Sequence, residues 1–449
     1  MTTSALAGLL PAWLPSQRWF AGSGATVTHL EIKSQVTLAE GDPELVHLMV
    51  DVTTGQERVS YQVPVGIRAA LPDALTSASI GTLPDGRVAY DAVADPELTG
   101  ILLRGIAAGR QTGRLGFRTE PGAVIDADAA ARALPPLASN SSVVFGDKAI
   151  LKVLRRPFAG AHPDLEVPAA LARNGSKLVA TPLGWIELTG CGQSEPVQAT
   201  ETEPSVLAIL SVFFANSADG WSLATASLHE PRQDFSGQAR LLGETTARMH
   251  AELAEAFGYS ELPEVALTDL ISAMKAELAR AVRAVPELRE HAEAVRACYE
   301  SLTERRTQVA VQRIHGDYHL AQVLGTEEGW IVLDFEGEPS VPLARRRAFA
   351  PPLRDVAGML RSFDYAGRHE AMRHPGDRRL AGAAAAWVRT CQDAFLAGYA
   401  DIAGLRPDAG DPLLRALILQ KAVYEAVYEA RHRPGWLPIP LAAIAEASR

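Results

Sequence analysis

The sequence is poor in cysteine and has no surplus of positive charge. It contains three cysteines in 449 residues, Cys191, Cys298 and Cys391, and they form no CxxC pair. A disulfide framework and a structural zinc site therefore lack their usual signature. The 43 Lys and Arg are outnumbered by 53 Asp and Glu, which gives a formal net charge of −10. This acidic balance argues against a general nucleic-acid-binding surface.

Long hydrophobic runs are also missing. No span approaches the roughly 20 apolar residues of a membrane helix, and the longest candidate, 206–215, contains Ser211 and has the length of a buried strand. The first basic residue is Arg18, so the start lacks the cationic segment of a secretory signal. We therefore expect a cytoplasmic monomer that binds neither membranes nor nucleic acid.

Several common catalytic motifs are absent. The chain has no G-x-x-x-x-G-K-[ST] loop, and no G-x-G-x-x-G follows a predicted strand. The sequence therefore lacks the main evidence for a P-loop or dinucleotide-binding protein. The G-x-S-x-G elbow of α/β-hydrolases is missing as well.

Hydrophobic periodicity divides the chain into a strand-rich front and a helical back. Apolar residues alternate over 46–52 and 59–65 around a glycine-containing turn, and again over 143–153 around Gly146, which predicts two hairpins. From about residue 235 the apolar spacing becomes helical, and the last long helix is expected over 413–431. This order predicts an α+β protein with two lobes.

The strongest chemical signal is the segment H-G-D-x-H-x-x-Q at 315–322, followed by D-F-E-G at 334–337. Two carboxylates and an amide oxygen can then share one cleft, as phosphoryl transfer from ATP requires. We expect Asp317 to be the catalytic base and Gln322 and Asp334 to bind Mg²⁺. The alternatives are two aspartates that merely form turns, or a zinc site at His315 and His319, which lacks a third ligand.

A cation for the nucleotide phosphates is predicted at Lys152, which alternates with large aliphatic residues in a strand. A lysine there either faces a polar cleft or lies at a sheet edge, and the downstream acidic pair favours the cleft. Glu166, at the start of a predicted helix, is its expected ion-pair partner. The polar residues expected to cover the phosphates lie just before this strand: Ser139, Asn140, Ser141 and Ser142.

The last long helix carries a polar and aromatic face. Lys421, Tyr424, Glu425 and Tyr428 are spaced i, i+3, i+4 and i+7, and Arg431 follows one turn later. Aromatic rings can cover the C–H faces of a sugar while charged groups bind its hydroxyls, so we expect a sugar site here. The alternative is a helix docked on its core with Lys421 and Glu425 as an exposed pair.

Two further side chains have expected structural roles. Asp355, beside Arg354, is expected to fasten the catalytic loop through hydrogen bonds. His250 lies in a predicted helix next to Met249 and is expected to pack in the core.

Together these residues resemble the aminoglycoside phosphotransferase-like branch of the protein-kinase-like fold, and more narrowly the bacterial maltokinases. The H-G-D and D-F-E segments are specific for the superfamily. The narrower resemblance comes from further stretches, most of all the C-terminal one, at 13–20, 139–143, 163–166, 219–221, 352–363 and 421–440.

This resemblance implies ATP-dependent phosphorylation of maltose to maltose 1-phosphate with Mg²⁺, in α-glucan metabolism. It implies a bilobal kinase-like fold: a β-rich N-terminal cap (1–90), a nucleotide-binding lobe (91–210) and a mainly helical lobe with the catalytic loop and sugar site (211–449). Phe213 is expected in the hinge that meets adenine, and His315 among the substrate contacts. The alternatives are a kinase for another sugar such as glucosamine, and a nucleotide- or glucan-binding module without turnover.

Overall fold

The computed structural model describes residues 2–21, 26–135, 140–189, 203–229, 234–304, 308–338, 341–404, 407 and 410–447. Its chain divides into two compact units. The first contains residues 1–169 and 180–215, and the second contains 170–179 and 216–449. The segments predicted as cap and nucleotide-binding lobe thus share the first unit, and the segment predicted as the helical lobe supplies nearly all of the second.

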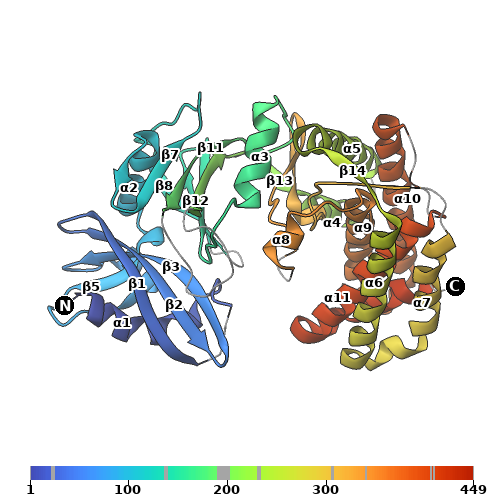
Figure 1. Ribbon diagram of the computed structural model, residues 1–449, viewed down its shortest axis with the longest axis horizontal. Coiled ribbons are helices and arrows are strands. Elements are labelled where there is room, and N and C mark those ends of the chain that lie inside the picture. The colour runs from blue at the N-terminus through green and yellow to red at the C-terminus, as the bar shows by residue number, and fades with distance from the viewer. Residues whose placement is uncertain are drawn as a thin grey trace. The chain divides into compact units, whose positions relative to one another are not determined.

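The cap is a five-stranded antiparallel sheet with one helix against it (Figure 1). The strand order is β1-β2-β3-β5-β4. Its elements are α1 (Thr2–Trp13), β1 (Val27–Ala39), β2 (Glu44–Thr54), β3 (Glu57–Arg68), β4 (Ser79–Thr82) and β5 (Val88–Asp91). The predicted 46–65 hairpin is confirmed as β2 and β3, which pair from Glu44–Ile67 to Thr54–Glu57. Its buried apolar residues form a core with Leu6, Leu10 and Trp13 of α1.

The rest of the first unit is a seven-stranded sheet in the order β6-β7-β11-β12-β10-β9-β8, with α2 packed against it. Here the predicted 143–153 hairpin is confirmed, since β9 and β10 pair with Ser142 opposite Lys152. The elements are α2 (Pro96–Ala107), β6 (Gln111–Thr112), β7 (Leu115–Thr119), β8 (Ala131–Ala133), β9 (Asn140–Phe145), β10 (Ala149–Leu154), β11 (Pro182–Leu188) and β12 (Ser205–Val212).

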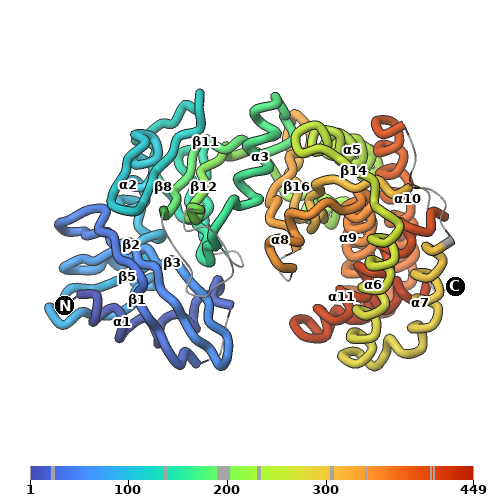
Figure 2. Tube along the Cα trace, in the orientation of Figure 1, coloured from blue at the N-terminus to red at the C-terminus, as the bar shows by residue number. Residues whose placement is uncertain are grey.

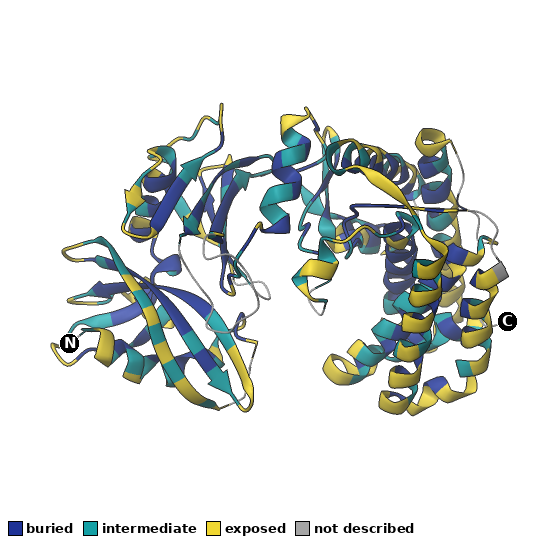
Figure 3. Ribbon diagram, in the orientation of Figure 1, coloured by how far each residue is buried: buried dark blue, intermediate teal, exposed yellow. Residues whose placement is uncertain are grey.

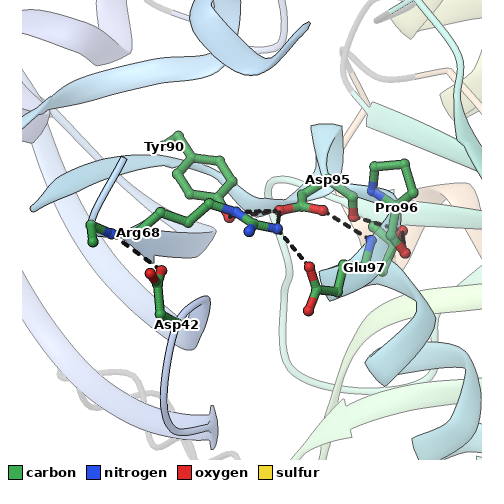
Figure 4. Close-up of polar contacts among 8 residues, drawn as sticks. Asp42, Arg68, Tyr90, Asp95, Pro96 and Glu97 are labelled. Atoms are coloured by element: carbon green, nitrogen blue, oxygen red, sulfur yellow. Dashed lines mark hydrogen bonds and ion pairs between the residues drawn. The ribbon is translucent and has the colours of Figure 1, made fainter. Parts of the chain in front are cut away.

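A buried polar network joins the cap to α2 (Figure 4). Asp95 precedes α2, and its Oδ1 accepts a hydrogen bond from the Glu97 amide at 2.9 Å. Its Oδ2 accepts from Tyr90 at 2.6 Å and from the Arg68 guanidinium at 2.8 Å. A carboxylate that caps a helix and binds both an arginine and a tyrosine fixes where the cap chain enters α2.

The second unit is mainly helical and begins within α3 (Pro163–Arg173), whose residues from Ala170 onward belong to it. Two small sheets, β13-β16-β17 and β14-β15, accompany its helices. The elements are β13 (Ala218–Asp219), α4 (Gly220–His229), α5 (Ser236–Phe257), β14 (Tyr259–Leu262), α6 (Glu264–Ala284), α7 (Ala292–Glu300), β15 (Val309–Gln312), β16 (Val323–Thr326), β17 (Gly329–Val332), α8 (Leu343–Arg346), α9 (Leu353–Arg373), α10 (Arg378–Ala403), α11 (Pro412–His432) and α12 (Pro438–Ala447).

Helix α9 lies at the centre of this unit. It packs against α4, α10, α11 and α12 (Figure 2), and a run of its residues from Asp355 to Gly367 is buried. By contrast, α6 and α7 show many exposed positions (Figure 3). A helix covered all round by other helices gives a fixed frame for the side chains at its ends. The strand-rich first unit and the helical second unit confirm the predicted α+β class.

Among the described residues, no helix combines the length and the apolar character needed to span a membrane.

Candidate active site

The H-G-D loop follows β15 and is held by Asp355 at the start of α9. The Asp355 carboxylate accepts hydrogen bonds from the amides of His315 at 2.8 Å and Gly316 at 2.9 Å. Its Oδ2 also lies 3.2 Å from Nε2 of His250. Both His250 and Asp355 are buried. The expected roles of Asp355 as the loop's anchor and His250 as a core residue are therefore confirmed.

Charge and hydrogen bonding keep Asp355 ionised in the interior. Burial alone would raise the pKa of this carboxyl, but the hydrogen bond and charge of His250 outweigh it and lower the pKa. Charge-assisted hydrogen bonds from two amides are stronger than neutral ones. The conformation of the H-G-D loop is thus held from a neighbouring helix.

His315 is positioned by the backbone around it. Its Nε2 lies 2.7 Å from the carbonyl of Leu333, and its Nδ1 accepts a hydrogen bond from the Asp317 amide at 3.3 Å. The ring is 1% exposed and lies against Phe335, with 4.9 Å between the ring centroids. With both ring nitrogens engaged, His315 links the H-G-D loop to the D-F-E segment. This geometry does not support its expected place among the substrate contacts.

The two expected metal ligands lie side by side. Nε2 of Gln322 is 3.2 Å from Oδ2 of Asp334, and the Leu333 amide donates to the Gln322 carbonyl at 2.9 Å. Asp334 has a positive φ of 62°, a left-handed conformation that is uncommon outside glycine. Such backbone strain clusters at functional sites. A carboxylate beside an amide gives the oxygen donors that Mg²⁺ takes, so this pair fits the ion.

Asp317 is paired with a lysine from the last long helix. Lys421 Nζ lies 3.1 Å from Oδ1 of Asp317 and 3.2 Å from Oε2 of Glu338. Tyr424, one turn along α11, donates to the other oxygen of Glu338 at 2.5 Å. The catalytic loop and the polar face of α11, which are 104 residues apart in sequence, thus meet in one cluster.

The charges of this cluster shift its pKa values. Burial raises the pKa of Asp317, but Lys421 and His319 outweigh it, so the pKa falls below its ordinary value. Burial lowers the pKa of Lys421, and the carboxylates of Asp317 and Glu338 more than compensate and raise it. Burial also lowers the pKa of His319, whose Nε2 lies 3.9 Å from Asp317. Asp317 is therefore ionised and Lys421 charged at neutral pH.

A cavity of about 780 Å³ opens beside this cluster, entirely within the second unit. Asp317, Lys421 and Glu338 lie in its wall together with aromatic rings: Trp221, Tyr365, Tyr424, Tyr428 and Trp436. Small-molecule sites typically occupy about 300–1,000 Å³. Trp221 stacks on Trp436 with 6.4 Å between centroids, and the Arg433 guanidinium lies 4.3 Å from the Trp436 ring centroid. The cavity therefore combines an ionised carboxylate with broad apolar faces.

The structure brings together the α11 residues expected to bind sugar. Lys421, Tyr424, Glu425, Tyr428 and Arg431 all line the cavity. The Glu425 carboxylate accepts hydrogen bonds from the guanidinium of Arg361 at 2.7 Å and 2.9 Å. The sequence pattern did not predict this role of Arg361. Lys421 lies on Asp317 and Glu338, so it is not half of an exposed ion pair with Glu425.

The expected nucleotide-binding residues lie in the first unit. Lys152, in β10, donates to Asp164 of α3 at 2.8 Å, two residues before the expected partner Glu166. Both carboxylates lie in the first turn of α3. The Lys152–Glu166 pair stays a prediction, and Asp164 is a partner that the sequence pattern did not single out. A helical first turn places several carboxylates within reach of one strand, so tertiary geometry selects among them.

The polar segment before β10 divides between the two faces of its strand. Ser141 is buried, and its hydroxyl accepts a hydrogen bond from Arg155 at 2.9 Å. Asn140 and Ser142 alternate with it and are half-buried. The Ser141 side chain was expected to help cover the phosphates. Alternation along the strand instead turns its hydroxyl inward, toward Arg155. Ser139 lies outside the described residues.

Phe213 directly follows β12, close to the end of the first unit at Ala215. Its amide donates to the carbonyl of Lys148 at 2.8 Å. That amide is therefore bound to the turn between β9 and β10. The expected contact of this segment with adenine stays a prediction.

Several cavity residues were not predicted as site residues. Glu338 directly follows the D-F-E-G segment at 334–337. Its position next to this motif, close to Asp334 in sequence, is the signal that could have identified it. Trp221 and Tyr365 come from α4 and α9, distant in sequence from α11. Only the fold places these aromatic rings together, so local pattern carries no signal for them.

Comparison with known proteins places the chain in a family. Residues 130–406 match the model of the phosphotransferase enzyme family, which covers more than half of the chain. The chain belongs to this family. Residues 13–95 match the maltokinase N-terminal cap domain. The predicted resemblance to the maltokinases is thereby confirmed at the level of the family and the cap, and the chain is a kinase-type phosphotransferase.

Two curated relatives align with about two thirds of the chain. The glucosamine kinase of Streptacidiphilus jiangxiensis is 31% identical over 319 residues, which cover 67% of this chain and 70% of the relative. The glucosamine kinase of Mycolicibacterium smegmatis (strain ATCC 700084 / mc(2)155) is 30% identical over 322 residues, covering 68% and 76%.

Solved structures share the fold. A glucosamine kinase in complex with glucosamine, ADP and inorganic phosphate has a TM-score of 0.68 and 24% identity, with 98% of both chains covered. Crystal form B of a glucosamine kinase has a TM-score of 0.70 at 24% identity, again with 98% of both chains covered. These likenesses and the family match confirm the predicted bilobal kinase-like fold with an N-terminal cap.

Proposed function

We propose that this chain is an ATP-dependent sugar kinase that converts maltose to maltose 1-phosphate with Mg²⁺. The observation that carries the proposal is the cavity itself, in which an ionised Asp317 stands beside stacked aromatic rings. The maltokinase cap and the phosphotransferase family support a sugar kinase.

The chemistry follows from the positions of the acidic groups. A sugar hydroxyl bound in the cavity donates its proton to Asp317 as its oxygen forms a bond to the γ-phosphorus of ATP. The bond between that phosphorus and the β–γ bridging oxygen breaks, and ADP leaves. Asp317 is suited to accept the proton because it is already ionised. Gln322 and Asp334 would hold Mg²⁺, which supplies positive charge to the phosphates.

The pairing of the wall carboxylates with lysine and arginine supports a neutral sugar over an amino sugar. An ammonium group is best held by a carboxylate without another cation. Among the described residues, each acidic side chain of the wall already pairs with a cation. Lys421 binds Asp317 and Glu338, Arg361 binds Glu425, and Arg433 binds Glu429. Glucosamine is the second candidate, because both curated relatives are named for it.

The size and lining of the cavity suit a disaccharide. About 780 Å³ is near the upper part of the usual range for small-molecule sites. Two pairs of stacked rings in the wall, Tyr424 with Tyr428 and Trp221 with Trp436, provide two aromatic surfaces. Each can cover the apolar face of one sugar ring.

A binding module without turnover is less well supported. The predicted base is ionised, the two oxygen donors for Mg²⁺ are adjacent, and the H-G-D loop is anchored by Asp355. Binding alone requires none of these arrangements. A site built only to bind a glucan would gain nothing from a strained Asp334.

Product analysis tests the proposal. The protein is incubated with ATP, Mg²⁺ and one sugar from a panel of maltose, glucose, trehalose and glucosamine, and phosphorylated products are identified by mass and NMR. We expect maltose 1-phosphate as the main product. A faster reaction with glucosamine would overturn the maltose assignment while leaving the kinase assignment intact. Nucleotide binding without ADP release on any sugar would favour the binding module.

A further inference from the structure

A buried arginine joins the cap to the strands expected to bind the nucleotide. Arg155 directly follows β10, the strand of Lys152, and is 1% exposed. Its Nη2 donates to Asp91, the last residue of the cap strand β5, at 2.6 Å. The guanidinium also lies over the ring of Trp19 in the cap, 4.6 Å from the ring centroid. Two separate parts of the cap therefore hold one side chain.

The same guanidinium contacts the polar segment before β10. Its Nε donates to the hydroxyl of Ser141 at 2.9 Å. Ser141 lies in β9 between Asn140 and Ser142, and Ser142 stands opposite Lys152 in the register. Through one planar group, the cap thus reaches the strand pair that carries both the lysine and the polar segment.

A third cap residue fixes the backbone of the same strand. The backbone amide of Gln62, in β3, donates to the Arg155 carbonyl at 3.0 Å. Its side-chain Nε2 donates to the Leu154 carbonyl at 2.7 Å and to the Leu207 carbonyl of β12. The end of β10 is therefore held through its carbonyls while Arg155 is held through its guanidinium. A planar guanidinium with several directed bonds fixes orientation as well as position.

We propose that Arg155 is a positioning residue through which the cap sets the placement of the nucleotide phosphates. It acts through Ser141 and the β9–β10 hairpin and touches no substrate itself. The inference rests on the proposed function, because it takes Lys152 and the polar segment to meet the phosphates of ATP. It gives the cap an indirect role in nucleotide binding by the first unit.

The test separates nucleotide binding from sugar binding. Arg155→Met keeps an unbranched apolar stem and removes the guanidinium with its contacts to Asp91, Trp19 and Ser141, while Ser141→Ala removes only the contact to the hairpin. We expect Arg155→Met to raise KM for ATP about 10-fold or more, with KM for the sugar within about 2-fold of wild type. Ser141→Ala should shift KM for ATP in the same direction by a smaller factor, with its melting temperature near that of wild type.

A conservative variant and a matched control sharpen the result. Arg155→Lys keeps the charge near Asp91 but cannot form the forked contacts, so it should recover melting temperature more than nucleotide affinity. Arg58→Met is the control, because Arg58 is an exposed cap arginine bound to Asp51 and Glu31. It should change neither KM value.

Calorimetric binding of Mg·ATP keeps this test independent of the sugar's identity. Weaker binding in Arg155→Met and Ser141→Ala, with normal binding in Arg58→Met, supports the proposal. Wild-type affinity in a folded Arg155→Met, or in Ser141→Ala if the former does not fold, overturns it. An equal loss for ATP and sugar also overturns it, since that pattern indicates general destabilisation. A wild-type protein that phosphorylates no sugar would contradict the proposed function alone.

Discussion

The two units use buried charge in different ways. In the first unit, the buried Arg155 and the half-buried Arg68 bind carboxylates at a strand end and a helix start, and so join pieces of the scaffold. In the second unit, Lys421 and Arg361 bind carboxylates that line a cavity. Similar ion pairs thus stabilise a junction in one place and prepare a binding surface in the other. Pairing alone does not mark a functional site; the open volume beside it does.

The comparison is closest between two lysine–aspartate pairs. Lys152 with Asp164 joins a strand to a helix start, at 2.8 Å. Lys421 with Asp317 joins a helix to a loop, at 3.1 Å, with Glu338 as a third member. We expect the first pair to act on ATP and the second on the acceptor. Substitutions in the two units test whether the two pairs act on different reactants.

The largest effect is expected when the base of the second unit loses its charge. Asp317→Asn should lower kcat by about 10²–10⁴-fold, because the amide cannot accept the proton of the sugar hydroxyl. Steady-state kinetics with far-UV circular dichroism checks this. Asp85→Asn, an exposed cap substitution, serves as the control and should retain wild-type kcat. A folded Asp317→Asn protein with near-normal turnover would remove Asp317 from the mechanism.

Acid should weaken the first unit through His47, which is buried between strands of the cap. Burial lowers the pKa of His47 from 6.5 to about 4, despite the hydrogen bond with Gln62. The unfolded chain therefore binds the proton first, and stability falls as the pH drops from about 6.5 to 4. The maximum loss from this group is about 3 kcal/mol.

Denaturant unfolding at a series of pH values measures this loss. His47→Gln keeps a polar group near Gln62 and removes the titration, so its free energy of unfolding should decline less steeply between pH 6.5 and 4. Parallel pH profiles for wild type and variant would contradict the assignment to His47.

The two lysines should separate the two substrates. Lys152→Met is expected to raise KM for ATP by about 10–100-fold with little change for the sugar, and Lys421→Met to do the reverse. The reason is that each lysine orients groups around a different reactant. Initial rates with one substrate varied at a time give both constants. Identical patterns in the two variants would show that the pairs do not divide the substrates.

The smallest effect is expected at the outer edge of the cavity. Tyr428 is 40% exposed and stacks on His432 and Tyr424. Tyr428→Ala should raise KM for maltose about 5-fold, since an exposed aromatic contact contributes about 1 kcal/mol. Tyr259→Ala, another exposed tyrosine, 74% exposed in β14, is the matched control. Equal KM values in both variants would exclude Tyr428 from the sugar site.

The sequence predicts features that depend on local periodicity. Alternation located both hairpins, and i, i+3, i+7 spacing placed Lys421, Tyr424 and Tyr428 on one helix face that does line the cavity. The H-G-D and D-F-E segments were found because their residues are close in sequence.

Long-range pairing escaped prediction. Arg361 holds Glu425 from 64 residues away, and Lys421 reaches Asp317 and Glu338 only because α11 packs on α9. Strand alternation alone does not tell which face is inward, so the role of Ser141 toward Arg155 was missed. Choosing between Asp164 and Glu166 likewise needs the orientation of α3, which no local pattern fixes.

The left-handed backbone at Asp334 restricts which substitutions this position tolerates. Among residues with a side chain, aspartate and asparagine adopt that conformation most readily, and only aspartate adds a negative charge. Glutamate would keep the charge but disfavour the left-handed conformation. Glycine would adopt this conformation but has no side-chain oxygen. Design of altered ion preference in this protein should therefore vary Gln322 and leave Asp334 fixed.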